Sequence, residues 1–384
     1  MNNKPRYNEG TERHQIVNLL HISGVITPRS YQLFNRPQHM ANVMVKLKKE
    51  GVVEKSKNGE VFENISLATY KDNLEEYFYD NIPYENIEYF EEYGKRDIKR
   101  AKYRKKEMAG DSQRIIRCGE IIALMYSTGI ATLPSDKKTA VKNKTLMKNV
   151  YYQSREIKYY SGYKDEVTES DNERTLIATR INGTLLTAGG NYNIYHIGKD
   201  IQVWSTQGEY RIKNYIENML ANYINKESCA LNKAILFTYD LNIFTRLVNP
   251  AHKLKARYEG LEMTYKDLYV LPYDRFGKDM IKIMSESDWE YKLKFLIMEE
   301  KPQDTSMEEV VCDYVVDGAY YLLFCIPNIS RYLDFIRKAA FVNKKEKFQI
   351  VCFDYQLDFV KRSAGNFAEI STTSFDEIFA DWNS

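Results

Sequence analysis

The sequence of 384 residues lacks any long hydrophobic run. Its longest apolar stretch, residues 319–327, is about half as long as the ~20 residues that a membrane-spanning helix needs. The first ten residues, MNNKPRYNEG, contain no apolar segment of the kind found in a secretory signal. We therefore expect a cytoplasmic protein with no membrane partner.

Cysteine and histidine are also scarce, with five residues of each. The cysteines are scattered and never form a CxxC pair, which indicates reduced thiols and not a disulfide framework or a zinc site. No two histidines have the spacing of His-x-His or HExxH, so the clustered histidines of an HUH-type nicking relaxase are missing. The phosphate-binding motifs GxGxxG and GxxxxGK(S/T) are missing too, and we expect no cofactor.

The remaining composition is typical of a globular chain, with 43% hydrophobic residues. At about 100–200 residues per domain, the length predicts two or three domains. Tyrosine is abundant, with 31 residues, and we interpret these side chains mainly as core and interface filling.

The net charge of +2 hides an asymmetry along the chain. Residues 1–164 carry 29 Lys and Arg against 20 Asp and Glu, which gives +9 and leaves −7 for the other residues. Within the first part, residues 95–106 hold eight bases and one acid. A basic half joined to an acidic half is typical of a protein that binds an anionic polymer. Solvated helix faces are the alternative interpretation of such charge runs.

Residues 11–68 predict a winged helix-turn-helix domain. Helical spacing begins after Thr11, a short helix begins at Thr27-Pro28, and a third helix extends over 36–50. Two strand-like runs then surround Asn58-Gly59, a strong hairpin signal. In this motif the third helix enters the DNA major groove and the hairpin touches the backbone.

The polar face of the predicted third helix carries residue types that read DNA. Asn and Gln pair with adenine, and Lys and Arg bind phosphates. The alternatives are a winged helix that contacts protein and a generic small helical domain. We predict that bases are faced by Gln38, His39, Asn42 and Lys46. We predict that phosphates are held by Arg29, Ser30, Arg36, Lys55, Lys57 and Asn58, helped by Lys99, Arg100 and Arg104 in the basic segment.

The rest of the chain predicts a larger α/β body, so the expected fold class is mixed α/β. We divide it into a charged helical linker over 69–110, a central α+β region over 111–230 and a C-terminal α/β region over 231–384. In the last region, four apolar runs are each followed by a polar residue and a helical pattern. Such β–α units favour a largely parallel sheet covered by helices.

Asp240, Asp274 and Asp354 end three of these apolar runs, where open α/β sheets collect ligands. One interpretation is a Mg²⁺ site of a nuclease or nickase. Two Glu-x-Lys triplets, at 156–158 and 299–301, are the only further sign of such an enzyme, and we interpret residues 295–298 (FLIM) as β-like. The simpler interpretation is that each aspartate caps a helix.

Several stretches resemble proteins of plasmids and integrative conjugative elements. They are the N-terminal segment from TERHQIVNLL to KKEGVVEK, then IIRCGEIIALMYSTGI, RINGTLLTAGGNYNIYHIGKDIQVW and QIVCFDYQ. The family concerned is the replication-relaxation and mobilisation accessory proteins with a winged helix. The resemblance implies a DNA-binding component of replication or relaxosome assembly, working beside a separate relaxase or replication protein.

We therefore expect a non-enzymatic protein that binds double-stranded DNA and forms a homodimer. The alternatives are a metal-dependent nuclease or nickase, and a transcriptional regulator whose α/β body binds a small effector.

Overall fold

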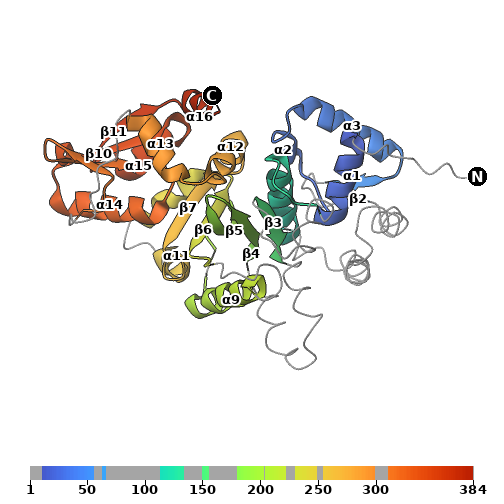
Figure 1. The fold of residues 1–384 in the computed structure, drawn as a ribbon, viewed down its shortest axis with the longest axis horizontal. Coiled ribbons are helices and arrows are strands. Elements are labelled where there is room, and N and C mark those ends of the chain that lie inside the picture. Colours follow the sequence, from blue (N-terminus) through green and yellow to red (C-terminus); the bar gives the residue numbers. More distant parts are fainter. Residues whose placement is uncertain are drawn as a thin grey trace, which may run out of the picture. The chain divides into compact units, whose positions relative to one another are not determined.

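The computed structural model describes residues 11–55, 63–65, 113–133, 149–154, 180–202, 204–221, 230–248, 254–298 and 310–383 (Figure 1). The chain divides into two compact units, the first made of residues 1–167 and 223–226, the second of 168–222 and 227–384. The four segments expected from the sequence do not follow this division, since the region 111–230 contributes to both units.

The first unit begins with three helices, α1 (Glu12–Ser23), α2 (Pro28–Tyr31) and α3 (Pro37–Lys49). Two short strands follow, β1 (Val53–Lys55) and β2 (Glu63–Ile65), which pair antiparallel with Val53 opposite Ile65. The helix starts match the expectation, because the Thr27 side chain caps α2 and Pro28 is its first residue. α2 is a short helix that ends at Tyr31.

A further helix over residues 113–127 completes the first unit. Ile116 packs with Val25 in one buried cluster, and the Tyr126 ring lies 6.5 Å from that of Phe34. A Cβ atom on Gly119 would lie 2.5 Å from the Val25 carbonyl oxygen, so only glycine allows this approach. The strand β3 (Val150–Gln153) also belongs to this unit, and Val150 bridges Ala131.

The second unit contributes four neighbouring strands to one sheet, in the order β4, β5, β6, β7. The pair β4–β5 is antiparallel, whereas β5, β6 and β7 run parallel. The strands are Ile181–Thr187, Gly190–Gly198, Lys233–Thr238 and Asp267–Pro272. The associated helices are α9 (Thr206–Met219), η4 (Leu241–Phe244), α10 (Thr245–Val248), α11 (Leu254–Glu262), α12 (Arg275–Met284) and α13 (Trp289–Met298).

A second sheet in this unit has the order β11, β10, β9, β8. Its strands β9, β10 and β11 are parallel, and β8 pairs antiparallel with β9. The strands are β8 (Tyr314–Val316), β9 (Ala319–Leu323), β10 (Phe348–Phe353) and β11 (Glu369–Thr373). The helical segments are α14 (Ile329–Val342), η5 (Lys345–Lys347), η6 (Asp354–Gln356), α15 (Leu357–Ala364) and α16 (Phe375–Trp382).

The predicted β–α units are confirmed, but they are divided between two mixed sheets instead of forming one largely parallel sheet. Residues 295–298, which we expected to be β-like, are the end of helix α13. Trp289 and Leu293, one helical turn apart, are the buried residues of α13, so its packing follows helical and not strand spacing. Glu299–Lys301 and the other triplet at 156–158 lie outside the described residues.

Tyrosine fills the core of the second unit, as expected. The rings of Tyr192, Tyr195, Tyr265, Tyr269 and Tyr332 are almost completely buried. Their hydroxyl groups find polar partners, because a buried phenol without one would be costly. The Tyr195 hydroxyl, for example, donates to Glu209 over 2.7 Å. No helix in the described part of the chain combines the length and apolarity that crossing a bilayer requires.

Candidate nucleic-acid interface

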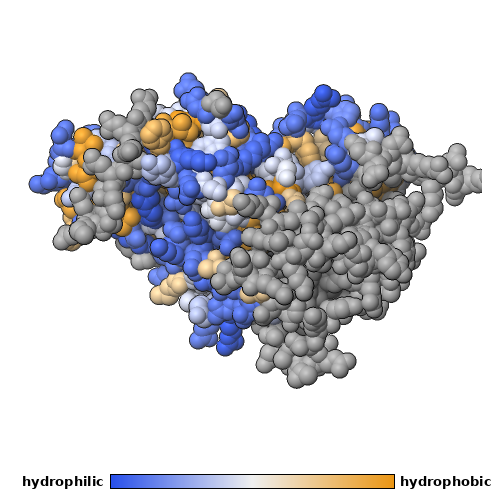
Figure 2. Space-filling model, in the orientation of Figure 1, coloured by the Kyte–Doolittle hydropathy of each residue, from blue (hydrophilic) through white to orange (hydrophobic). Residues whose placement is uncertain are grey.

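The helix α3 buries one side and exposes the other. Its buried residues Met40, Val43, Met44 and Leu47 follow helical spacing and pack into the first unit. The opposite side is exposed and hydrophilic in Figure 2. The predicted orientation of this helix is therefore confirmed: Gln38, His39, Asn42 and Lys46 all lie on the exposed side.

Four exposed residues form the centre line of this side. At a spacing of 4, 3 and 4 positions, they lie above one another on successive turns. We refer to them as the outward stripe: Gln38, Asn42, Val45 and Lys49. The exposed residues His39 and Lys46 flank the stripe on one side, and the partly exposed Ala41 and Lys48 flank it on the other.

Two polar contacts join α1 to opposite ends of α3. The carboxylate of Glu12 lies 2.6 Å from His39 Nε2, and Arg13 pairs with Glu50 just beyond α3. Adjacent residues on a helix project about 100° apart, which lets Glu12 and Arg13 reach two different ends of α3. His39 is thus half-exposed and engaged with a carboxylate, so it is a weaker candidate for a base contact than Asn42.

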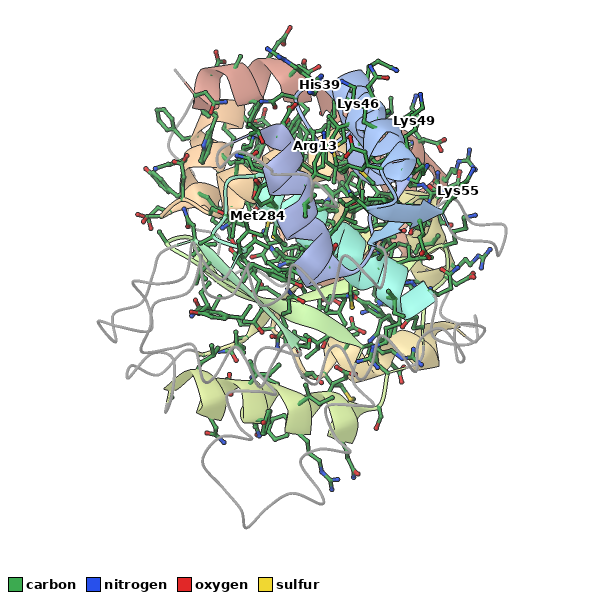
Figure 3. All side chains as sticks on the ribbon, turned by 90° about the vertical axis from the view of Figure 1, so that its right-hand side faces the viewer. Arg13, His39, Lys46, Lys49, Lys55 and Met284 are labelled. Atoms are coloured by element: carbon green, nitrogen blue, oxygen red, sulfur yellow. The ribbon has the colours of Figure 1, made fainter. Side chains whose placement is uncertain are left out.

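Cations gather around the C-terminal end of α3. Figure 3 shows Lys46 and Lys49 on α3 and Lys55 on β1, with side chains that extend away from the ribbon. None of these three has an ion-pair partner among the residues that the structure describes. Partial burial, together with the nearby Lys55 cation, lowers the pKa of Lys48 below its ordinary value. Cations this close together favour an anionic ligand.

The charge of the segment 11–55 agrees with this local picture. It contains seven Lys and Arg and three Asp and Glu, which gives +4. Of the three acids, Glu50 pairs with Arg13 and Glu12 contacts His39. The third, Glu54, is exposed beside Lys55, and Glu63 of β2 lies opposite Lys55 in the strand pairing, so Lys46 and Lys49 are farther along the chain from these carboxylates than Lys55 is.

Three of the predicted phosphate contacts lie at helix starts. Arg29 and Arg36 are exposed, and Arg36 is the residue before α3 with no side-chain capping bond. Ser30, in contrast, is 0% exposed, and its hydroxyl lies 3.1 Å from that of Thr27. A buried hydroxyl cannot reach a phosphate, so we correct the sequence prediction and leave Ser30 out of the interface.

Thr27 also explains why Ser30 is buried. Its hydroxyl donates to Glu120 over 2.8 Å, and Glu120 is itself 1% exposed. This bond attaches the start of α2 to the helix over 113–127, which covers the Ser30 side of α2. The remaining predicted contacts, Lys57, Asn58, Lys99, Arg100 and Arg104, lie outside the described residues.

Sequence reasoning missed Val45 and Lys48 in this interface. Val45 is 48% exposed at the centre of the outward stripe. The helical spacing from Gln38 already contained the signal, but a search for polar side chains passes over an apolar residue. Lys48 was missed because its closeness to Lys55 arises from the chain reversal after Gly51, which has a left-handed φ of 72°.

The three aspartates of the second unit act as caps or turn residues. Asp240 Oδ1 accepts from the Asn242 N–H, and Asp274 Oδ1 accepts from those of Phe276 and Gly277. Asp354 Oδ1 accepts from the Tyr355 N–H. Burial raises the pKa of Asp274, although the two backbone bonds oppose this shift. Among the described residues, no three His, Cys, Asp or Glu side chains form a group that could hold a metal ion.

Comparison with known proteins identifies no relative. No protein-family model, no curated protein and no solved structure matches the chain.

Proposed function

We propose that this protein binds double-stranded DNA through its first unit, which acts as a winged helix-turn-helix. In this proposal α3 is the recognition helix, and β1 and β2 are the base of the wing. The observation that carries it is the outward stripe of α3, which presents two carboxamides in line on a helix whose opposite side is buried. A helix buried on every side would leave no such line exposed.

The cations support the same assignment. Lys46 flanks the stripe on one side and Lys48 on the other, Lys49 ends the stripe, and Lys55 lies near Lys48. Because Lys46 lies off the centre line, we assign it to a phosphate and not to the base that we predicted from the sequence. A major groove about 12 Å wide is bordered by two phosphate backbones, and a helix within it meets phosphates on both sides. Arg29 and Arg36 extend the exposed positive charge toward the start of α3.

Salt dependence tests this proposal directly. The full-length protein should bind a labelled random duplex at low salt, and the affinity should fall steeply as salt increases, because counterions are released from the DNA. Each of Lys46→Ala, Lys49→Ala and Lys55→Ala should weaken binding to every duplex and reduce the slope of log affinity against log salt by about 1. Fluorescence anisotropy measures both quantities.

The matched control is Lys345→Ala, which removes an exposed lysine of η5 in the second unit. It should leave the affinity and the slope unchanged. If the protein does not bind a duplex at low salt, or if Lys345→Ala has the same effect as the three α3 and β1 variants, DNA binding by this surface is refuted.

We further propose that the second unit binds another copy of the chain, as an accessory protein of plasmid replication or mobilisation would need. The N-terminal resemblance supports the biological setting. Exposed aromatic residues support the interface: Tyr291 and Phe295 are 53% and 46% exposed one turn apart on α13, where Figure 2 shows hydrophobic side chains at the surface. A dimer would place two recognition helices on two half-sites.

Light scattering on the full-length protein checks this part of the proposal. We expect a dimer, and we expect Phe295→Ser to shift it toward the monomer because the interface loses apolar area. Phe341→Ser, at an 85% exposed position at the end of α14, is the control and should not change the mass. A parent protein that stays monomeric at micromolar concentration, with and without DNA, contradicts dimerisation.

A further inference from the structure

The four side chains of the outward stripe differ in their chemistry. Gln38 and Asn42 end in carboxamides, and Val45 presents only methyl groups. The one cation of the stripe, Lys49, is at its C-terminal end, and α3 contains no arginine. The nearest arginine, Arg36, precedes the helix.

This choice has a chemical meaning in the major groove. A carboxamide donates one hydrogen bond and accepts another, which matches N7 and the N6 amino group of adenine. Guanine presents two acceptors there and is read best by arginine or lysine. An exposed methyl group matches the C5 methyl of thymine. We infer that α3 reads A·T base pairs, with Gln38 and Asn42 on adenine and Val45 on a thymine methyl.

The spacing of the stripe sets the length of the A·T core. A helix rises 1.5 Å per residue, so Gln38 and Asn42 are separated by about 6 Å along the axis, and Asn42 and Val45 by about 4.5 Å. Together they extend over about 10 Å, or about three base-pair steps of roughly 3.4 Å. The recognised element is therefore a run of about four A·T pairs, with Lys49 placed beyond it.

We assign Val45 to a thymine methyl group because of its position and not because it is exposed. Single exposed apolar residues are ordinary on protein surfaces. Val316, for example, is 46% exposed on β8 of the second unit. Val45 differs because it lies in line with Gln38 and Asn42 on a side that is otherwise polar. The two valines have the same side chain and nearly the same exposure, and they form a matched pair for experiment.

The inference rests on the proposed function and is tested by competition. A labelled random duplex bound to the full-length protein is displaced by poly(dA-dT) or by poly(dG-dC). We expect the A·T polymer to compete at least tenfold better. Replacing adenine by 7-deazaadenine removes the N7 acceptor and should weaken binding of the parent about tenfold. The effect should be smaller in Asn42→Ala, where only Gln38 still reads adenine, and absent in the double variant Gln38→Ala with Asn42→Ala. Replacing thymine by uracil removes the methyl group and should weaken the parent about fourfold.

The valine pair then identifies the methyl contact. The effect of uracil should disappear in Val45→Ala and persist in Val316→Ala. Because both positions are exposed, neither variant should lose its fold.

The possible results separate the two proposals. Equal competition by the two polymers, or a preference for G·C, overturns the A·T inference and leaves DNA binding intact. An A·T preference that neither modified base changes also overturns it, because the minor groove or the shape of the duplex would then be read. A protein that binds neither polymer at low salt refutes the proposed function and this inference with it.

Discussion

Glu209 is an ionisable side chain held in the interior of the second unit. It is 5% exposed at the start of α9 and accepts a hydrogen bond from Tyr195. The Tyr195 hydroxyl also lies 2.9 Å from that of Tyr265, to which Asn193 donates. Burial raises the pKa of Glu209 above its ordinary value, against the opposing effects of Tyr195 and the cation of Arg180. The folded protein therefore holds the proton more tightly than the unfolded chain does.

This shift makes the stability of the second unit depend on pH. A raised pKa contributes stability that is fully present below the ordinary carboxyl pKa and is lost as the pH rises through the raised value. Glu209→Gln resembles the protonated form at every pH. We expect the variant to match the parent most closely at low pH and to become the more stable of the two as the pH rises.

Urea unfolding at several pH values, followed by tryptophan fluorescence, measures this difference, because Trp204 packs edge-on against Tyr195. Glu346→Gln, which makes the same substitution at an exposed position in η5, is the control for the substitution itself. A pH-independent difference for Glu209→Gln would show that Glu209 is not the group that titrates.

The interface itself shows which residue properties a sequence reveals. The apolar spacing of α3 is enough to predict that Asn42 is exposed and Met44 buried, because both follow from the helix period. It is not enough to predict that Ser30 is buried. That property depends on Glu120, which lies 90 positions further along the chain and has no periodic relation to α2.

At the scale of elements, the helix over 113–127 supports the surface that presents α3. Gly119 on this helix touches the backbone of Val25, in the connection between α1 and α2, and Tyr126 packs near Phe34 just before α3. The helix thus contacts both ends of α2 without contributing a side chain to the predicted interface.

Gly119→Ala tests this support. The new Cβ would approach the Val25 carbonyl oxygen to 2.5 Å, so the helix must shift, and we expect the first unit to lose about 1–3 kcal/mol of stability. Gly208→Ala in α9 is the control, since its nearest neighbour is 3.4 Å away, and it should be neutral or slightly stabilising. Hydrogen exchange of residues in α1 and α3 measures the local effect. Unchanged exchange there in Gly119→Ala would mean that the helix does not support this surface.

Individual elements are the level at which sequence reasoning succeeds best here. Caps at Thr27 and Asp274 mark true helix starts, because each side chain accepts a backbone N–H of the first turn. The interpretation of 295–298 as β-like is wrong, because a short apolar run has no period that separates a strand from a helix.

At the scale of the whole molecule, the strand partners are what the sequence does not specify. The apolar runs that become β7 and β9 look equivalent along the chain, yet they belong to different sheets. Pairing depends on contacts between distant residues, whereas runs and caps are local. The charge asymmetry is visible from composition alone, and the structure places part of its basic half around α3.

We therefore interpret the molecule as two units. The first is proposed to bind DNA, and the second is proposed to bind the second unit of another copy of the chain. Specific binding requires that bases, and not only phosphates, contribute to affinity. In this account Asn42 makes such a contribution from the centre of the outward stripe, whereas the surrounding lysines bind any sequence.

The most direct measurement is the ratio between the affinity for a preferred duplex, selected from a random library by the full-length protein, and the affinity for random duplex at the same salt. Asn42→Ala should lower this ratio about tenfold while leaving the affinity for random duplex nearly unchanged. Asn383→Ala, at an exposed position of the second unit, should leave the ratio as it is in the parent. If the Asn42→Ala protein keeps the full ratio of the parent, α3 is not the element that reads the DNA.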